Sequence, residues 1–112
     1  MINSFKAANI DVGSLSVSIT PATGVTGTLT TGEANSGTVT IPAGALYVKI
    51  ENAGMVASGD TPGNITVNGQ PFTPGRIEIF NAIIDPQNNE FIFLPEIEIT
   101  TSGARVRYAY FG

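Results

Sequence analysis

The sequence predicts an all-β protein, an antiparallel β-sandwich or jelly roll of roughly eight or nine short strands without significant helix. Thirteen glycines and seven prolines interrupt the chain at short intervals, and the segments between them are rich in β-branched residues. Several segments alternate apolar and polar residues, as strands with one buried face do. We expect residues 1–13 to form an N-terminal arm or first edge strand, and residues 14–112 to form a single sandwich domain.

The first predicted strand covers residues 14–20. Leu15, Val17 and Ile19 alternate there with serine and threonine, and the proline that follows ends the pattern. Residues 22–36 are small and polar, which predicts a long loop or a weak edge hairpin.

Two strands are predicted on either side of a Pro-Ala-Gly turn, over residues 38–41 and 46–51. Alternation in the second strand assigns three side chains to the core: Leu46, Val48 and Ile50. The same alternation leaves the intervening side chains outside: Tyr47, Lys49 and Glu51.

Asn68-Gly69 is the strongest hairpin signal in the chain, because a type I′ turn requires positive φ at both central residues. Its register places Ile65 opposite Phe72. Pro71 marks the returning strand as a sheet edge, since proline has no backbone N–H to donate to a neighbouring strand.

A further strand is predicted over residues 76–80, and a polar turn over residues 85–90. Residues 91–94, Phe-Ile-Phe-Leu, are apolar at consecutive positions, as in a strand that is covered on both faces. We expect the second sheet to cover one face, and the N-terminal arm or a neighbouring subunit to cover the other.

Residues 96–112 predict a hairpin in which two alternating segments flank a Ser102-Gly103 turn. The predicted register pairs apolar residues on one face: Ile99 with Val106 and Ile97 with Tyr108. On the other face it pairs polar residues: Glu98 with Arg107 and Thr100 with Arg105.

Composition restricts the possible functions. The chain has no Cys and no His, which removes thiolate nucleophiles, disulfides, the usual general base and the commonest transition-metal ligand. A net charge of −4 with five basic residues argues against nucleic acid as a partner. No apolar run is long enough to span a membrane, and the N-terminal residues lack the apolar core of a secretion signal. We therefore expect no enzyme, cofactor or membrane contact.

Two acidic groups could nevertheless carry chemistry. Four side chains gather oxygen ligands in one turn, as a calcium site needs: Asp85, Asn88, Asn89 and Glu90. The alternative is an Asx turn between two strands. Glu96 and Glu98 superficially resemble a glycosidase pair, but arginine partners would keep both ionised, unlike a general acid.

The candidate contacts with other proteins are five apolar or aromatic residues: Phe5, Tyr47, Ile92, Leu94 and Phe111. Phe5 belongs to the N-terminal arm, and Ile92 and Leu94 belong to the strand that needs cover on both faces. Tyr47 is expected on the surface. Phe111 has the opposite parity to the core side chains of its strand, so it is the preferred contact with another subunit.

Three segments resemble small β-sandwich virion proteins of tailed bacteriophages. They are TVTIPAGALYVKIENAG at 38–54, ITVNGQPFTPGRIEIF at 65–80 and LPEIEITTSG at 94–103. The resemblance implies a virion structural protein, such as a capsid decoration or auxiliary protein, a head-fibre base or a tail component, without catalytic residues. It further implies assembly in the host cytoplasm, self-association, with a trimer as our expectation, and docking on the capsid or other virion proteins. The alternative is a carbohydrate- or receptor-binding module at a tail or fibre tip.

Overall fold

The computed structural model describes residues 9–10, 19–20, 27–85, 87–88 and 90–112, and these contain strands but no helix. The strands in chain order are β1 (Asn9–Ile10), β2 (Ile19–Thr20), β3 (Leu29–Ile41), β4 (Tyr47–Gly54), β5 (Ile65–Val67), β6 (Gln70–Phe72), β7 (Ile77–Asn81), β8 (Ile83–Asp85), β9 (Glu90–Ile92) and β10 (Ile97–Phe111). The predicted all-β class is confirmed. Some predictions fall outside the described residues: the contact candidate Phe5 with the rest of residues 1–8 of the N-terminal arm, and residues 14–18 of the first predicted strand.

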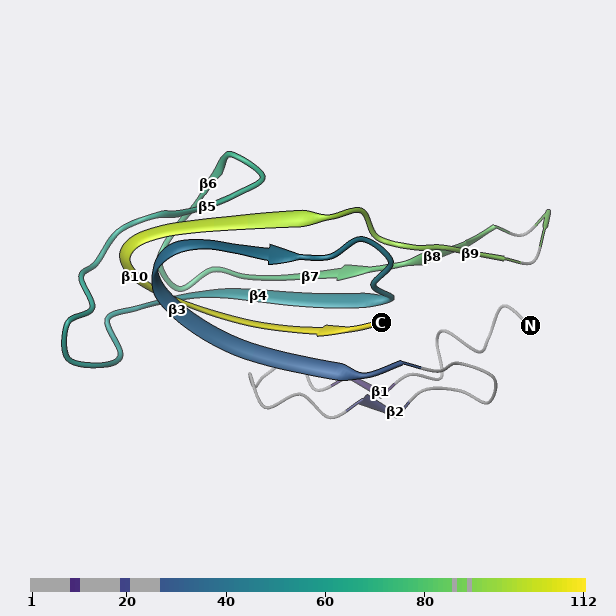
Figure 1. Cartoon of the computed structure of the whole chain (residues 1–112), viewed down its shortest axis with the longest axis horizontal. Coiled ribbons are helices and arrows are strands. Elements are labelled where there is room, and N and C mark those ends of the chain that lie inside the picture. Colours follow the sequence, from purple (N-terminus) through teal and green to yellow (C-terminus); the bar gives the residue numbers. More distant parts are fainter. Residues whose placement is uncertain (1–8, 11–18, 21–26, 86, 89) are drawn as a thin grey trace.

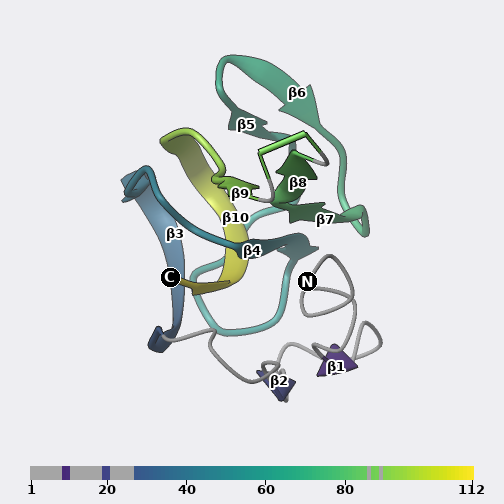
Figure 2. The ribbon, with the colours of Figure 1, turned by 90° about the vertical axis from the view of Figure 1, so that its right-hand side faces the viewer.

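One six-stranded antiparallel sheet forms the body. Its order is β6-β5-β10-β4-β7, and β3 pairs with the other side of β10. The two longest strands, β3 and β10, bend back on themselves, so the sheet curls into a half-barrel (Figures 1 and 2). Two smaller two-stranded ladders, β1-β2 and β8-β9, complete the described strands.

The predicted C-terminal hairpin is wrong, because β10 is a single strand of 15 residues. Its first half pairs with β5 through Ile99 and Thr100, and its second half pairs with β4. The register with β3 shifts between Ser102 and Val106, which is where the strand bends. This bulge switches the inward parity, as the predicted turn would have done. Ile99 and Val106 therefore still share one core.

Residues 22–36 were predicted to form a long loop or a weak edge hairpin, and the loop is wrong from residue 29 onward. β3 begins at Leu29 and follows β10 along its whole length, from Ile97 opposite Ile41 to Phe111 opposite Leu29. Small polar residues give no local strand signal, but the long partner strand supplies the backbone hydrogen bonds that hold this segment extended.

The hairpin at Asn68-Gly69 is confirmed. Asn68 and Gly69 have φ of 49° and 79°, and Ile65 lies opposite Phe72. β6, which contains Pro71, is at the edge of the sheet as predicted. A local turn signal therefore fixed both the register and the place of these strands.

The main core lies inside the curled sheet. It contains ten buried residues: Ile41, Ala45, Val48, Ile50, Ile65, Phe72, Ile97, Ile99, Ala104 and Val106. A second cluster contains Leu46, Tyr47, Ala82, Ala109 and Phe111. The prediction that Leu46, Val48 and Ile50 are buried is confirmed, but the prediction that Tyr47 and Lys49 face outward is wrong, since both are buried as well.

Candidate functional site: an open groove and an exposed hairpin

Tyr47 and Phe111 are not surface residues of this chain. They are direct partners on β4 and β10, and they are 2% and 7% exposed. Both belong to the second apolar cluster. Their opposite parity to the main core was recognised in the sequence, but the sequence alone did not show that this side of the sheet has a core of its own.

Asp60 is the most heavily bonded acid among the described residues. Arg105 donates to both of its carboxylate oxygens, from Nε at 3.2 Å and from Nη2 at 2.9 Å. Asn35 Nδ2 and the backbone amides of Val56 and Ala57 donate as well, at 3.0, 3.1 and 2.9 Å. The Arg105 guanidinium, followed by these amides, lowers the pKa of Asp60 far below its ordinary value. In turn, Asp60 raises the pKa of Arg105.

This network is structural, because every oxygen of Asp60 is already used. It ties the loop after β4 to the bends of β3 and β10, where Asn35 and Arg105 lie. The partners predicted for the arginines were wrong. Arg107 lies opposite Glu33 of β3, with Nε 3.5 Å from its carboxylate, whereas Glu98 lies opposite Thr40.

The turn between β8 and β9 has the geometry of an Asx turn. Asp85 Oδ1 accepts from the Gln87 amide at 2.9 Å, and Asp85 Oδ2 accepts from Asn88 Nδ2 at 2.7 Å. These bonds, that of Asn88 first, lower the pKa of Asp85. Asn89 lies outside the described residues. In the described part of the chain, no three His, Cys, Asp or Glu residues gather as metal ligands would, and the calcium site stays a prediction without support.

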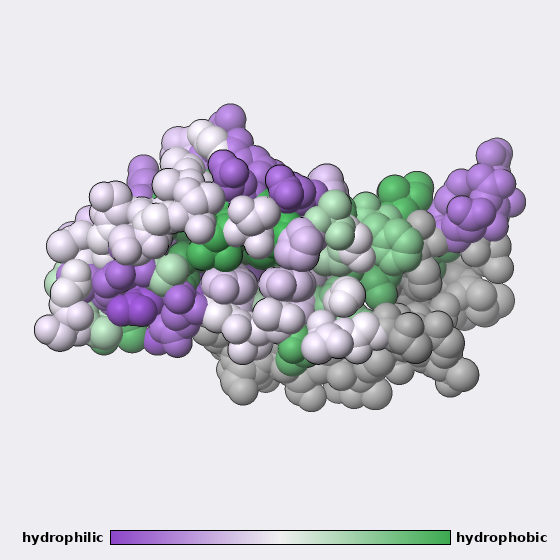
Figure 3. All heavy atoms as spheres, in the orientation of Figure 1, coloured by the Kyte–Doolittle hydropathy of each residue, from purple (hydrophilic) through white to green (hydrophobic). Residues whose placement is uncertain are grey.

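The β8–β9 hairpin, residues 83–92, projects from the body of the protein (Figure 1). Ile83 and Ile92 are direct cross-strand partners, and they are 61% and 50% exposed. The adjoining Phe93 is 53% exposed. The predicted cover by a second sheet is therefore wrong for Ile92 and Phe93, whereas cover by a neighbouring subunit stays a prediction. Figure 3 shows apolar surface next to the hydrophilic tip of this hairpin.

Leu94 anchors the base of the hairpin. It is half-buried, and its backbone exchanges hydrogen bonds with the turn before β4: the Leu94 amide donates to Ala45 O, and the Gly44 amide donates to Leu94 O, both at 2.9 Å. Of the two interface candidates in this segment, Ile92 is thus exposed, whereas Leu94 mainly attaches the hairpin to the body.

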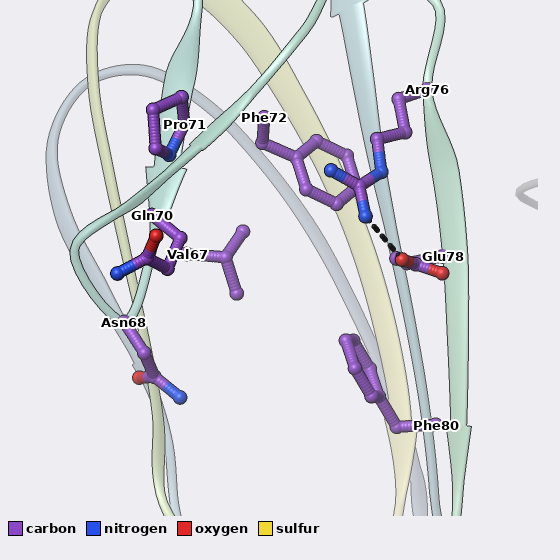
Figure 4. Close-up of a pocket in the computed structure, with 8 residues that line it drawn as sticks. All are labelled: Val67, Asn68, Gln70, Pro71, Phe72, Arg76, Glu78 and Phe80. Carbon is purple, nitrogen blue, oxygen red and sulfur yellow. Dashed lines mark hydrogen bonds and ion pairs between the residues drawn. The ribbon is translucent and has the colours of Figure 1, made fainter.

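A groove opens between the β5–β6 hairpin and β7, where the curled sheet does not close (Figure 4). It encloses about 300 Å³ and is lined by eight residues: Val67, Asn68, Gln70, Pro71, Phe72, Arg76, Glu78 and Phe80. The Arg76 guanidinium lies over the Phe72 ring, 4.7 Å from its centroid, and bonds to the Glu78 carboxylate. In the lining, Phe72 is buried and Val67, Glu78 and Phe80 are half-buried, whereas the remaining four residues are exposed.

Asn52 of β4 connects the two walls of this groove, β6 and the start of β7. Its Nδ2 donates to Phe72 O at 2.9 Å and to Gly63 O at 3.0 Å, and its Oδ1 accepts from the Gly54 amide at 3.0 Å. Its backbone amide donates to Arg76 O at 3.0 Å. The side chain is fully buried, so these bonds fix β6 and the start of β7 relative to β4.

Sequence reasoning did not identify the groove, Ile83 or Asp60. The groove exists because β6 and β7, which are far apart in the sheet order, face each other when the sheet curls. Asp60 is a single acid in a loop and has no distinctive neighbours in sequence. The consecutive isoleucines at 83–84 were a usable signal, since an apolar pair beside a polar turn often lies at a surface that is covered in use.

The comparisons with known proteins give no relative. No protein-family model matches the chain, and no curated protein and no solved structure matches it either. Among the described residues there is also no helix long and apolar enough to cross a membrane.

Proposed function

We propose that this chain is a structural protein that acts by associating with copies of itself and by docking on a larger particle. The exposed pair Ile83 and Ile92 carries the proposal. Large apolar side chains grouped on a projecting hairpin cost free energy in water, and they are typical of surfaces that another protein covers. The hairpin is anchored by backbone hydrogen bonds at Leu94, so it presents these side chains in a defined position.

The placement of the charges supports a role without catalysis. Asp60 is saturated by five donors, and Arg105 is bound to it. A carboxylate held in this way has a lowered pKa, whereas a general acid at neutral pH needs a raised one. The composition, without His and Cys, points in the same direction.

The particle that we propose is the virion of a tailed bacteriophage, in which the chain would serve as a capsid decoration or auxiliary protein. The three segments that resemble such proteins support this proposal. The bent strand β10 is compatible with it, because both halves of this strand contribute side chains to the main core and pair with different strands. We propose a trimer as the unit that occupies a capsid site.

The mass in solution tests self-association directly. Multi-angle light scattering and sedimentation of the full chain, from about 1 to 100 µM, should give a multiple of the mass of 11.6 kDa. Incubation with capsids of candidate phages, followed by density-gradient separation, should show the chain moving with particles. A monomer at every concentration that also fails to bind particles would overturn the proposal.

A second function is favoured by the groove. Its rim combines donors and acceptors in planar side chains around Phe72 and Phe80, which is a composition suited to a carbohydrate or receptor ligand. Binding on a glycan array that is lost on Arg76→Ala would support this function. An array without a reproducible signal would exclude the glycans it displays.

A further inference from the structure

We infer that the β8–β9 hairpin of one copy occupies the groove of a second copy, in a head-to-tail contact. This inference rests on the proposed self-association and names the two surfaces that would carry it. Each surface offers what the other lacks: the hairpin presents apolar side chains to water, and the groove is an apolar hollow of about 300 Å³ with a charged rim.

The apolar parts are matched in kind. Ile83 and Ile92 are cross-strand partners, so their side chains stand side by side on one face of the hairpin. The groove is lined on one wall by Val67 and on the other by Phe80, both of which are half-buried. A pair of branched side chains entering between these walls would remove water from both surfaces at once.

Charged residues lie beside the apolar ones on both surfaces, at the same spacing along a strand. The next pair on the same face of the hairpin is Asp85 and Glu90, about 7 Å from the isoleucines. In the groove, Glu78 follows Phe80 at the same spacing on the inner face of β7, and the Arg76 guanidinium lies against Glu78 (Figure 4). An isoleucine pair over Phe80 therefore brings the acidic pair to the Arg76–Glu78 ion pair, in which Arg76 is the group that can bind a further carboxylate.

Glu90 is the acid that would meet Arg76. The oxygens of Asp85 already accept hydrogen bonds from its own turn, whereas Glu90 is exposed. The Arg76 side chain is 46% exposed, and its guanidinium has further N–H groups besides the one that bonds to Glu78. One arginine can thus serve a carboxylate of its own chain and one of the neighbour.

The area of the hairpin alone is too small for a stable contact. A few half-exposed apolar side chains provide on the order of 300 Å², whereas stable interfaces bury about 1,200–2,000 Å² in total. Insertion into a groove increases the area, because both sides of the hairpin and both walls become buried. Since the two surfaces differ, the contact is heterologous, and it closes into a ring such as a trimer or continues as a filament.

Charge exchange tests the contact. Glu90→Lys and Arg76→Glu, each alone, should weaken association at least about tenfold, measured by sedimentation, and the double variant should regain most of it. An equimolar mixture of the two single variants should associate more strongly than either variant alone, since contacts between unlike variants are complementary. In a ring of three copies, one contact still joins like variants, so the double variant should associate better than the mixture. Glu96→Lys, an exposed acid outside both surfaces, is the matched control and should leave association unchanged.

Cross-linking gives a second readout that does not depend on charge. The natural chain contains no Cys, so an Ile92→Cys variant mixed with a Gln70→Cys variant can form a disulfide only between the introduced residues. We expect the mixed disulfide under mild oxidation, and much less with Met55→Cys in place of Gln70→Cys. Circular dichroism and thermal unfolding of each variant establish that it folds.

The outcomes separate the two proposals. If the natural chain associates but the charge exchanges change nothing and Ile92→Cys prefers partners other than Gln70→Cys, then the head-to-tail contact is wrong and self-association stands. If the natural chain is monomeric at every concentration, both are wrong.

Discussion

Arg105 binds Asp60 through two hydrogen bonds across 45 positions of the chain, and this contact fixes the loop after β4 against the bend of the longest strand. The two residues meet because the bulge in β10 directs Arg105 towards this loop, where the Val56 and Ala57 amides already orient the carboxylate. The contact between Arg105 and Asp60 therefore depends on the bend of β10, and it should form only when the sheet is curled.

Replacing Asp60 should destabilise the protein. Asp60→Asn replaces one hydrogen-bond-accepting oxygen by an NH₂ group, which then faces N–H donors. It also removes the negative charge that binds Arg105 through two hydrogen bonds. We expect a clearly lower melting temperature by circular dichroism and faster amide exchange in the loop over residues 55–64. Glu96→Gln, at an exposed acid, serves as the control and should melt like the natural protein.

The effect of Asp60 should depend on pH in a definite direction. Its pKa in the folded protein lies below the ordinary value of 3.8, so its contribution is complete above that value and is lost as the pH falls through the lower folded value. The difference in unfolding free energy between the natural protein and Asp60→Asn should be largest near neutral pH and should shrink below about pH 4. A difference that grows in acid would contradict this account.

Gly103 should not tolerate a side chain. Its φ is +109°, and a Cβ atom there would collide with Thr61. Gly59 has a similar φ of +94° but no atom within 4 Å of a Cβ, so Gly59→Ala measures the backbone strain alone. We expect Gly59→Ala to cost about 1–2 kcal/mol and Gly103→Ala at least about 1 kcal/mol more, measured by urea denaturation. Equal costs would show that Thr61 moves aside.

Phe111 should contribute to the stability of a single chain. Because it packs in the second apolar cluster, Phe111→Ala should cost about 3–5 kcal/mol at any protein concentration. Phe93→Ala removes the same side chain from a position that is 53% exposed, and it should cost about 1 kcal/mol or less. If Phe111→Ala left the unfolding free energy unchanged but reduced the oligomer mass, the sequence-based assignment of Phe111 to a subunit contact would be restored.

Asn52 should be required for the shape of the groove. Asn52→Ala removes the donor to the buried Phe72 carbonyl and to the partly buried Gly63 carbonyl, and it should cost about 2–4 kcal/mol in unfolding free energy. Increased amide exchange should appear in both walls, over residues 70–72 and 76–80. Asn64→Ala, at an exposed asparagine nearby, should change neither quantity. Faster exchange in one wall alone would contradict a bridging role.

The sequence by itself determined the fold class, the Asn68-Gly69 hairpin and the inward side chains of β4. These features depend on neighbours a few positions apart: alternation selects a face, and positive φ at a turn selects Asn and Gly. The Asx turn at Asp85 also followed from local residues, whereas the exposure of Ile92 did not, since its apolar run predicted cover on both faces. No such local rule covers the pairing of strands that are distant in the chain.

Tertiary structure decided the rest. Val106 pairs with Ala34, more than seventy positions earlier in the chain. No residue in the polar segment before residue 36 predicts that this segment pairs with β10. The continuous β10, the burial of Tyr47 and Phe111, and the groove all result from this pairing, because it determines which way the sheet curls and which faces become covered. Alternation shows which side chains share a face, whereas only the packed sheet shows whether that face meets water.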